Sequence, residues 1–514
     1  MSENRVDPAS KSPPTPRRPG FLASLARHTS NYSIGTLLVT LASIVSFSFF
    51  TRIFSVADYG TLGLVSSTIG FLVGVGKFGV QHAVVRFYAE VDSGARKVDR
   101  NVFFSTVLFG MAGLGAVATL LSAAGALIIP GAWWGGTGME YLLALASPLV
   151  LIRVLDSGLL NLLRSQQRSG FYSLYTVSRK YLGLAVILLA LFLFARNLES
   201  FFVATMVTES LAVLILIAYY THSQPITLRQ FSWPLLTAMI VFGLPLLASE
   251  LSGILLNIGA RFIINAKMGP ESLGAYSAAF NFSEYVQAIL TGAFAQAVVP
   301  MYFKTWEQQG RAATTEFLQQ SLRYYIAVSV AVLAGMAAIG PEMLRLLASD
   351  RYDAGGALIP FVVAGMLISG GTPIFSAGVY IKKQTKVVMY SVLAAAIANL
   401  TLTALLLDSY GLAGAAFAVL VSYVLFSAST AYFGRHTIKI KMPWLDLLKF
   451  SALAYTMYLL VGTIHAKNLV LQLLLQIPVG VLSFGGLLLL SDKPIRDLAR
   501  QLFGRLRAKF AQPR

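Results

Sequence analysis

Charge is what this sequence lacks most. Only 12% of its 514 residues are Asp, Glu, Lys or Arg, whereas 56% are hydrophobic. A soluble domain carries about 25% charged residues, so this chain has too little polar surface to fold as a set of soluble domains. The composition therefore excludes a water-soluble globule and predicts that most of the chain lies in lipid.

Cysteine is absent, and histidine is scarce at five residues. Without cysteine the chain has no disulfide, no thiolate nucleophile and no cysteine-ligated metal site. No Walker lysine motif occurs, and the glycine-rich runs lack the strand, loop and helix context of a nucleotide-binding loop. We therefore expect no cofactor, no metal and no ATP hydrolysis, and the few histidines inside apolar runs do not support a histidine proton relay.

Long polar segments are also missing. Fourteen apolar runs are long enough to cross a membrane, and the connections between them are short. The sequence thus predicts an all-α polytopic membrane protein. Residues 203–222 and 416–436 place small, branched and aromatic residues alike, which indicates two pseudo-symmetric six-helix lobes. The expected parts are a disordered tail (1–31), an N-lobe (32–221), a C-lobe (235–432), a helix pair (448–491) and a basic amphipathic tail (492–514).

Positive charge is in excess, with 40 Lys and Arg against 22 Asp and Glu, a net charge of +18. In a soluble protein this excess suggests nucleic-acid binding, but here the cations are spread over many short connections. If the N-terminus is cytoplasmic, thirty of the 40 lie on the cytoplasmic side, seven lie opposite and three lie in or beside spans. The positive-inside rule then predicts that both termini are cytoplasmic and that nucleic acid is not a partner. This count treats residues 163–180 as a cytoplasmic connection.

The basic tail has apolar residues at helical spacing between its arginines. This pattern is typical of a helix that lies on an anionic membrane surface. A partner-binding helix is the alternative.

Ionisable residues inside the apolar runs need an explanation, because each costs about 2.5–3.5 kcal/mol near the bilayer centre. Arg153 and Asp156 are three residues apart and can pair along one helix. Lys77 either faces a cavity or extends to the headgroups. Glu209 either pairs with a cation across its lobe or accepts a proton. The full set is Lys77, Arg153, Asp156, Glu209, Glu250, Glu284 and Arg323.

A polar stripe is predicted on the outer half of the seventh helix. Glu250, Asn257 and Arg261 are separated by 7 and 11 positions, which keeps them within about 20° of one line over about 16 Å. The stripe is either a cavity wall or a structural lock between lobes. On the eighth helix Asn281 and Glu284, with neighbouring tyrosines, offer contacts suited to sugar rings, although aromatic residues at this spacing also serve for packing.

Three motifs carry a family resemblance: TRIFSVADYG (51–60), ARFIINAKMGPESLGAYSAAF (260–280) and GLAGAAFAVLVSYVL (411–425). They resemble the polysaccharide (O-antigen type) flippases of the multidrug, oligosaccharidyl-lipid and polysaccharide exporter superfamily, over about residues 28–490. Ala260 stands where family members typically carry aspartate.

The resemblance implies a flippase of the bacterial inner membrane that works by alternating access. Its substrate would be an undecaprenyl-pyrophosphate-linked oligosaccharide repeat unit for surface polysaccharide or exopolysaccharide. Membrane lipids and the polymerase and chain-length proteins of the same pathway would be its partners. The cavity cations expected to face this substrate are Arg52, Lys77, Arg153 and Arg261. The residues expected to couple an ion or contact sugar are Glu209, Glu250, Asn257, Asn281 and Glu284.

Two other functions compete with this interpretation. A cation-coupled drug exporter of the same superfamily favours acidic groups in its cavity, and Lys77 and Arg153 argue against a cationic drug. A membrane glycosyltransferase or polysaccharide polymerase usually needs a substantial outer loop with acidic or arginine catalytic residues, and every outer connection here is short. We therefore expect a transporter and not an enzyme.

Overall fold

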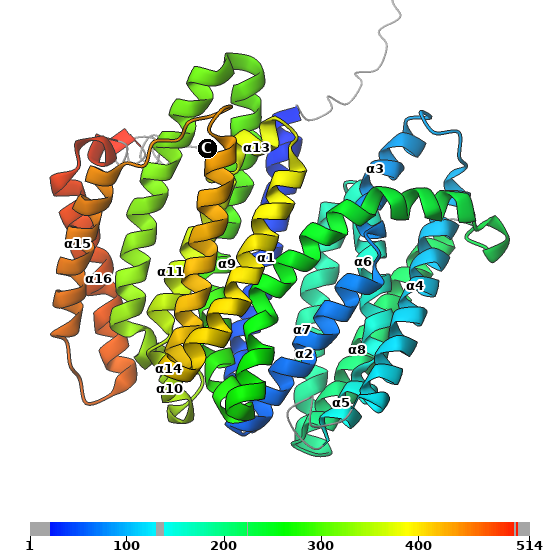
Figure 1. The fold of residues 1–514 in the computed structure, drawn as a ribbon, viewed down its shortest axis with the longest axis horizontal. Coiled ribbons are helices and arrows are strands. Elements are labelled where there is room, and N and C mark those ends of the chain that lie inside the picture. Colours follow the sequence, from blue (N-terminus) through cyan, green and yellow to red (C-terminus); the bar gives the residue numbers. More distant parts are fainter. Residues whose placement is uncertain (1–20, 130–137, 224, 498–499, 502–514) are drawn as a thin grey trace, which may run out of the picture.

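The computed structural model describes residues 21–129, 138–223, 225–497 and 500–501, and those residues form helices and connections without a strand (Figure 1). Several helices cross the bundle once and unbroken. They are α1 (Phe21–Ile53), α2 (Val56–Gly76), α4 (Arg100–Ile128), α7 (Ser169–Leu193), α8 (Leu198–Ser223), α15 (Trp444–Gly462) and α16 (Leu469–Ser491). Other crossings are assembled from shorter pieces, α5 (Met139–Ala146) with α6 (Pro148–Ser165), and α11 (Ile359–Gly370) with α12 (Thr372–Phe375) and α13 (Ala377–Ile381). The short elements are α3 (Val80–Asp92), η2 (Leu228–Gln230), η3 (Asp350–Tyr352) and α10 (Asp353–Gly356).

Two helices are too long for one crossing. α9 (Trp233–Leu347) has 115 residues, which would extend about 170 Å if it were straight. Its backbone leaves helical geometry at Gly269 (φ 82°) and Gly310 (φ 77°), so that it forms three segments. α14 (Thr385–Gly434) is divided in the same way at Gly411 (φ 56°). The 11 long apolar helices of the described residues thus make fourteen crossings, which confirms the number predicted from hydropathy.

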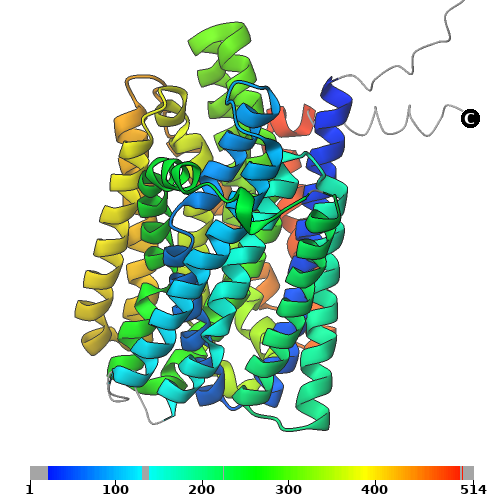
Figure 2. The ribbon, with the colours of Figure 1, turned by 90° about the vertical axis from the view of Figure 1, so that its right-hand side faces the viewer.

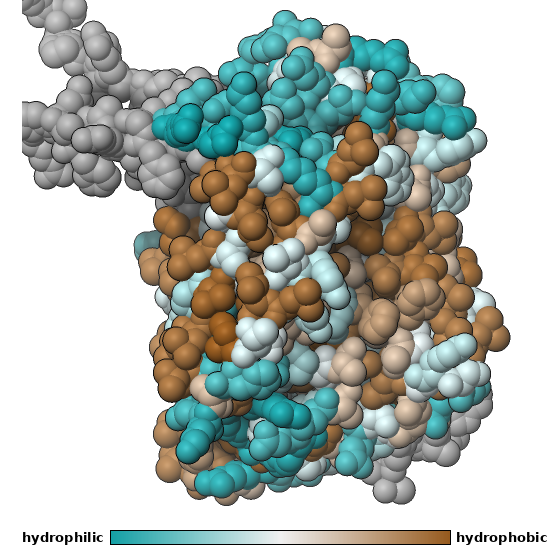
Figure 3. Space-filling view, turned by 90° about the vertical axis from the view of Figure 1, so that its left-hand side faces the viewer, coloured by the Kyte–Doolittle hydropathy of each residue, from teal (hydrophilic) through white to brown (hydrophobic). Residues whose placement is uncertain are grey.

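The outer surface between the two ends of the bundle is apolar. Figure 3 shows a hydrophobic band between two hydrophilic ends. Large aliphatic side chains are open on this surface, among them Leu120 at 70% and Leu482 at 72% exposure. Such exposure is unfavourable in water and ordinary in lipid, so the chain is a multi-pass membrane protein.

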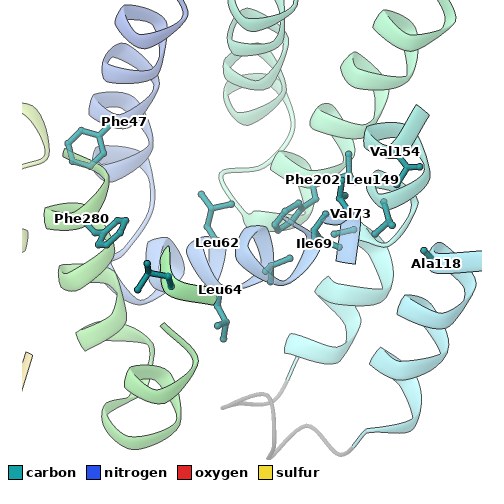
Figure 4. Close-up of a cluster of buried hydrophobic side chains, with 14 of the residues drawn as sticks. Phe47, Leu62, Leu64, Ile69, Val73, Ala118, Leu149, Val154, Phe202 and Phe280 are labelled. Atoms are coloured by element: carbon teal, nitrogen blue, oxygen red, sulfur yellow. The ribbon is translucent and has the colours of Figure 1, made fainter. Parts of the chain in front are cut away.

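The helices gather into two groups, here named the N-terminal bundle (α1–α8) and the C-terminal bundle (α9–α14), with α15 and α16 at the outer edge (Figure 1). The end that holds the start of α1 and the end of α16 is called the upper end. A single buried core continues through both bundles. Figure 4 shows Leu62 and Ile69 of α2 between Phe280 of α9 and Leu149 of α6. α2 therefore packs against both bundles.

The first helix begins earlier than expected. α1 begins at Phe21, whereas the disordered tail was expected to extend to residue 31. Residues 1–20 lie outside the described part, as do 498–499 and 502–514 of the basic tail.

The position of one charged pair was predicted wrongly. Arg179 and Lys180 were counted in a cytoplasmic connection spanning 163–180, but only residues 166–168 separate α6 from α7. Both cations lie inside α7, where their charges interrupt the hydropathy signal without ending the helix.

An ion cluster fixes α15 and α16 to the C-terminal bundle at its upper end. Arg323 of α9 lies 3.0 Å from Asp446 of α15 and 2.6 Å from Asp492, which follows α16. Lys449 of α15 lies 2.7 Å from Asp492, whose side chain is 1% exposed. Burial alone would raise the pKa of Asp492, but hydrogen bonds from Lys449, the Ile495 N–H and Arg323 lower it below its usual range. This carboxylate stabilises the fold at neutral pH, and its contribution is lost only as the pH falls through that lowered pKa.

The Asp492→Asn variant is expected to lower the free energy of unfolding by about 2 kcal/mol, since two partly buried cations lose their shared carboxylate. The matched control is Asp408→Asn, which breaks a 2.6 Å pair with Lys267 at a side chain that is 67% exposed. Such an exposed pair is worth less than about 1 kcal/mol. Apparent melting temperatures in detergent check the difference, and equal shifts for the two variants would contradict the role given to Asp492.

Candidate functional site

At the lower end, arginines of each bundle bind the end of a helix in the other. Arg52 at the end of α1 donates to the carbonyls of Leu346 and Leu347 at 2.5 and 2.9 Å, where the last segment of α9 ends. In return Arg351 donates to the carbonyls of Thr51 and Arg52, each at 3.1 Å. The last carbonyls of a helix have no partner within the helix and carry its negative dipole end, so a guanidinium satisfies both needs. These reciprocal contacts begin the surface named here the lower contact.

Two glycines let the backbones touch in the lower contact. A Cβ atom on Gly60 would lie 2.0 Å from the carbonyl oxygen of Pro270, and one on Gly274 would lie 2.0 Å from that of Val56. No side chain fits at either position. The backbones of α2 and α9 are therefore in direct contact at these two glycines.

Arg261 completes the lower contact. Its side chain is 8% exposed and donates to Ser67 of α2 at 3.1 Å and to Asn281 of α9 at 2.9 Å. Asn281 in turn donates to the Tyr59 hydroxyl at 2.9 Å. In this conformation Arg261 and Asn281 thus connect the two bundles.

At the upper end the bundles meet around one carboxylate. Glu250 of α9 accepts from Lys77 at 3.3 Å, from Gln81 at 2.5 Å and lies 2.9 Å from His82. The backbone breaks between α2 and α3, where Gly79 has φ 76°, and this break brings the three donors to one side. We name this surface the upper contact.

A second pair of glycines lies beside Glu250. A Cβ on Gly79 would lie 2.3 Å from the carbonyl oxygen of Gly243, and the reverse distance is also 2.3 Å. The first turns of α9 cross over the bundle here (dark green in Figures 1 and 2). The bundles are therefore in backbone contact at both ends.

A cavity of about 500 Å³ lies inside the N-terminal bundle, between α1, α6, α7 and α8. We name it the N-terminal cavity. Arg153 of α6 and Glu209 of α8 form a two-pronged ion pair across it, at 2.8 and 3.0 Å. Glu209 therefore pairs with a cation on the other side of its own lobe, which was one of its two expected roles. Two parallel bonds fix the rotation of both helices.

The predicted pair of Arg153 with Asp156 is wrong. Asp156 is 5% exposed and binds Arg179 at 2.5 Å and the Tyr175 hydroxyl at 2.8 Å. Arg153 and Asp156 lie on one helix but face α8 and α7 respectively, so each finds a partner on a different neighbour. Arg179 and the adjacent Lys180 both line the N-terminal cavity, and the prediction missed them. The sequence pattern that could have revealed them is a pair of cations inside an apolar run, with acidic residues in the neighbouring apolar runs.

The two ends of the polar stripe of α9 belong to different contacts. Glu250 belongs to the upper contact and Arg261 to the lower one, so the geometry at both ends matches the interlobe lock, one of the two alternatives. Between them Asn257 is exposed and accepts from the Tyr423 hydroxyl at 2.5 Å. Glu284 is exposed and forms no hydrogen bond or ion pair with another described residue, and the nearest charge acting on it is that of Arg261.

The nine candidate residues thus fall into four places and do not form one site. Arg52, Arg261 and Asn281 lie in the lower contact, Lys77 and Glu250 in the upper contact, Arg153 and Glu209 in the N-terminal cavity, and Asn257 and Glu284 on the C-terminal bundle. In the described part of the chain, no group of three His, Asp or Glu side chains is arranged to hold a metal ion.

Comparison with known proteins gives one family and one fold. The model of a family described as polysaccharide biosynthesis protein matches residues 49–355. No curated protein matches the chain. A solved structure titled lipid II flippase MurJ, inward closed conformation, is 15% identical, covers 92% of this chain and 100% of its own, and has a TM-score of 0.71.

Drug transporters share the same fold. An inward-facing multidrug resistance MATE family transporter of the MOP superfamily is 16% identical, covers 82% of this chain and 96% of its own, and has a TM-score of 0.60. A eukaryotic MATE transporter is 13% identical, covers 85% of this chain and 100% of its own, and has a TM-score of 0.59. At these identities the likeness concerns the fold alone.

The variant Gly243→Ala is expected to open the upper contact. Its methyl group would have to move roughly 1–2 Å from the Gly79 carbonyl to reach an ordinary contact distance. Spin labels on Ser93→Cys and Thr237→Cys, placed in a chain without native cysteine, should then show a longer and broader distance distribution. Gly253→Ala is the control, because a Cβ there meets nothing within 4 Å. An unchanged distribution in Gly243→Ala would contradict the close packing described for the upper contact.

Proposed function

The chain belongs to the polysaccharide biosynthesis protein family, and we propose that it moves a lipid-linked oligosaccharide across a bacterial inner membrane. The cargo is an undecaprenyl-pyrophosphate-linked repeat unit, carried from the cytoplasmic to the periplasmic leaflet for surface polysaccharide assembly. The upper end of the bundle faces the cytoplasm, as do both termini. Membrane lipids surround the protein, and the polymerase and chain-length proteins of the pathway take up its product.

One observation supports this proposal above the others. The two bundles touch at both ends through polar contacts that can be broken separately, a carboxylate cluster above and arginine-to-carbonyl bonds below. Opening one end while the other stays closed gives alternating access to the space between the bundles. Rearranging these bonds exchanges one set of polar partners for another, so the two states can lie close in free energy.

The residues of the two contacts are released when their contact opens. Arg52 and Arg261 below and Lys77 above then offer cations to the pyrophosphate, which reduces the cost of an anion in a low-dielectric region. Asn257 and Asn281 offer amide groups to sugar hydroxyls. Glu209, Glu250 and Glu284 are the carboxylates available for coupling to an ion.

A cation-coupled drug exporter is the second candidate, and the fold shared with MATE transporters is the observation that favours it. The charges of the N-terminal cavity oppose it. Arg153, Arg179 and Lys180 face it, and among the described residues Glu209 and the buried Asp156 balance them. One net positive charge disfavours a cationic drug in this cavity.

Complementation in a strain that lacks this protein tests the proposal. The wild-type chain should restore surface polymer and remove accumulated lipid-linked repeat units. Arg261→Gln should reduce polymer by at least about tenfold, which corresponds to the loss of about 1.4 kcal/mol of interaction. Asp408→Asn, at the exposed pair with Lys267, should leave polymer production unchanged.

Protein amounts in the membrane must be equal for the comparison to hold. Full polymer production by Arg261→Gln would remove Arg261 from the transport pathway. Drug resistance conferred by the wild-type chain without any restoration of polymer would favour the exporter instead.

A further inference from the structure

The N-terminal cavity contains a cation without a partner. Lys180 lines the cavity and forms no hydrogen bond or ion pair with any described residue, so that only the more distant charge of Glu209 attracts it. It lies 11 residues, about 16 Å, from the start of α7 at Ser169 and 13 residues from its end at Leu193. That position is near the middle of a hydrocarbon core about 30 Å thick. A lysine there costs about 2.5–3.5 kcal/mol unless water or an anion compensates its charge.

The neighbouring ion pairs do not remove this excess. Glu209 is engaged by both donors of Arg153, and Asp156 by Arg179 and Tyr175. The oxygens of these two carboxylates are thus already bonded, to the guanidinium groups of Arg153 and Arg179 and to the Tyr175 hydroxyl. The remaining charge belongs to Lys180, and Arg153 and Arg179 flank it at fixed positions.

The walls of the cavity suit a polar, ring-shaped ligand. Hydroxyl groups of several threonines and serines lie along α1, α7 and α8, and aromatic rings of Phe50 and Phe201 contribute at the lower end. A volume of about 500 Å³ is within the range of small-molecule sites, about 300–1,000 Å³. It holds one charged group with its adjoining sugar and not an entire oligosaccharide.

From this arrangement we infer that the N-terminal cavity binds an anionic group of the transported molecule, a carboxylate or a phosphate, with Lys180 as its primary cation and Arg153 and Arg179 as fixed flanking charges. The identity of the molecule that carries the anion rests on the proposed function, whereas the binding of an anion in this cavity does not. The anion comes either from an acidic sugar of the repeat unit or from the diphosphate of the lipid carrier. In both cases Lys180 selects for negative charge before the bundles move.

The chain has no cysteine, so a single introduced thiol reports on the cavity alone. Thr176→Cys places this thiol in the cavity wall, one helical turn from Lys180. Purified protein in lipid nanodiscs is treated with anionic, cationic or neutral methanethiosulfonates, and the rates are compared. Thr463→Cys, exposed just after α15 and outside the cavity, gives the reference ratio of reagent rates.

Adding Lys180→Gln to Thr176→Cys should lower the ratio of anionic to cationic rates by at least about tenfold, because one unit charge near the thiol is removed from a region of low dielectric. Lys180→Arg should keep the ratio, and the neutral reagent should react at the same rate in all three proteins, which shows that access is intact. Lys180→Gln should leave the ratio at Thr463→Cys unchanged.

Protection by added ligands identifies the source of the anion. Glucuronate should slow the neutral reagent if an acidic sugar occupies the site, and inorganic pyrophosphate should slow it if the diphosphate does, whereas glucose should not protect. The inference is overturned if neither anion protects, if Lys180→Gln leaves the ratio unchanged, or if the thiol reacts only after denaturation. These measurements need no transport, so they can fail or succeed independently of the complementation result.

Discussion

A charged side chain inside a bilayer must have a partner or water, and the arrangement of this protein depends on how that requirement is met. Each unpaired charge costs about 2.5–3.5 kcal/mol near the centre. Arg153 with Glu209, Arg179 with Asp156 and Lys77 with Glu250 all join different helices. These pairs help to determine the relative rotation of the helices. Without them, only small residues and dispersion would determine the packing.

The pairs inside a bundle and those between bundles have different consequences. The bond between Arg153 and Glu209 joins α6 to α8 within the N-terminal bundle and restrains these two helices relative to each other. The bonds of Glu250 and Arg52 join one bundle to the other at opposite ends, so opening either end must break the bonds at that end. Rigid bundles with separable contacts at two ends are what rocking motions require.

The number of crossings could be predicted from the sequence, because a run of about twenty apolar residues has few alternatives in a membrane. The partner of each charged side chain could not be predicted in this way. Arg153 and Asp156 have the right spacing to pair, yet each is nearer to a carboxylate or guanidinium on a neighbouring helix. The rotation of one helix against the next determines which residues pair. The residue spacing along a single helix gives no information on that rotation.

Arg179 and Lys180 show the same limit in another form. The count of basic residues assigned them to a cytoplasmic connection, because it gives each charge to the nearest connection and contains no information on an acidic partner on another helix. The convergence of Lys77, Gln81 and His82 on Glu250 was equally hidden, since it depends on a backbone break at Gly79. In the stripe of Glu250, Asn257 and Arg261 the two ends lie in opposite contacts, which spacing along one helix does not reveal.

The most direct measurement of the central claim is translocation by the purified protein. Liposomes containing the protein and a fluorescent undecaprenyl-pyrophosphate oligosaccharide are treated with a membrane-impermeant quencher, and the protected fraction is followed over time. The account predicts that inner-leaflet label becomes accessible only in protein-containing liposomes, while a fluorescent phospholipid of the same membranes stays protected. Retention of the labelled oligosaccharide in its original leaflet, with properly folded protein present, would contradict the account.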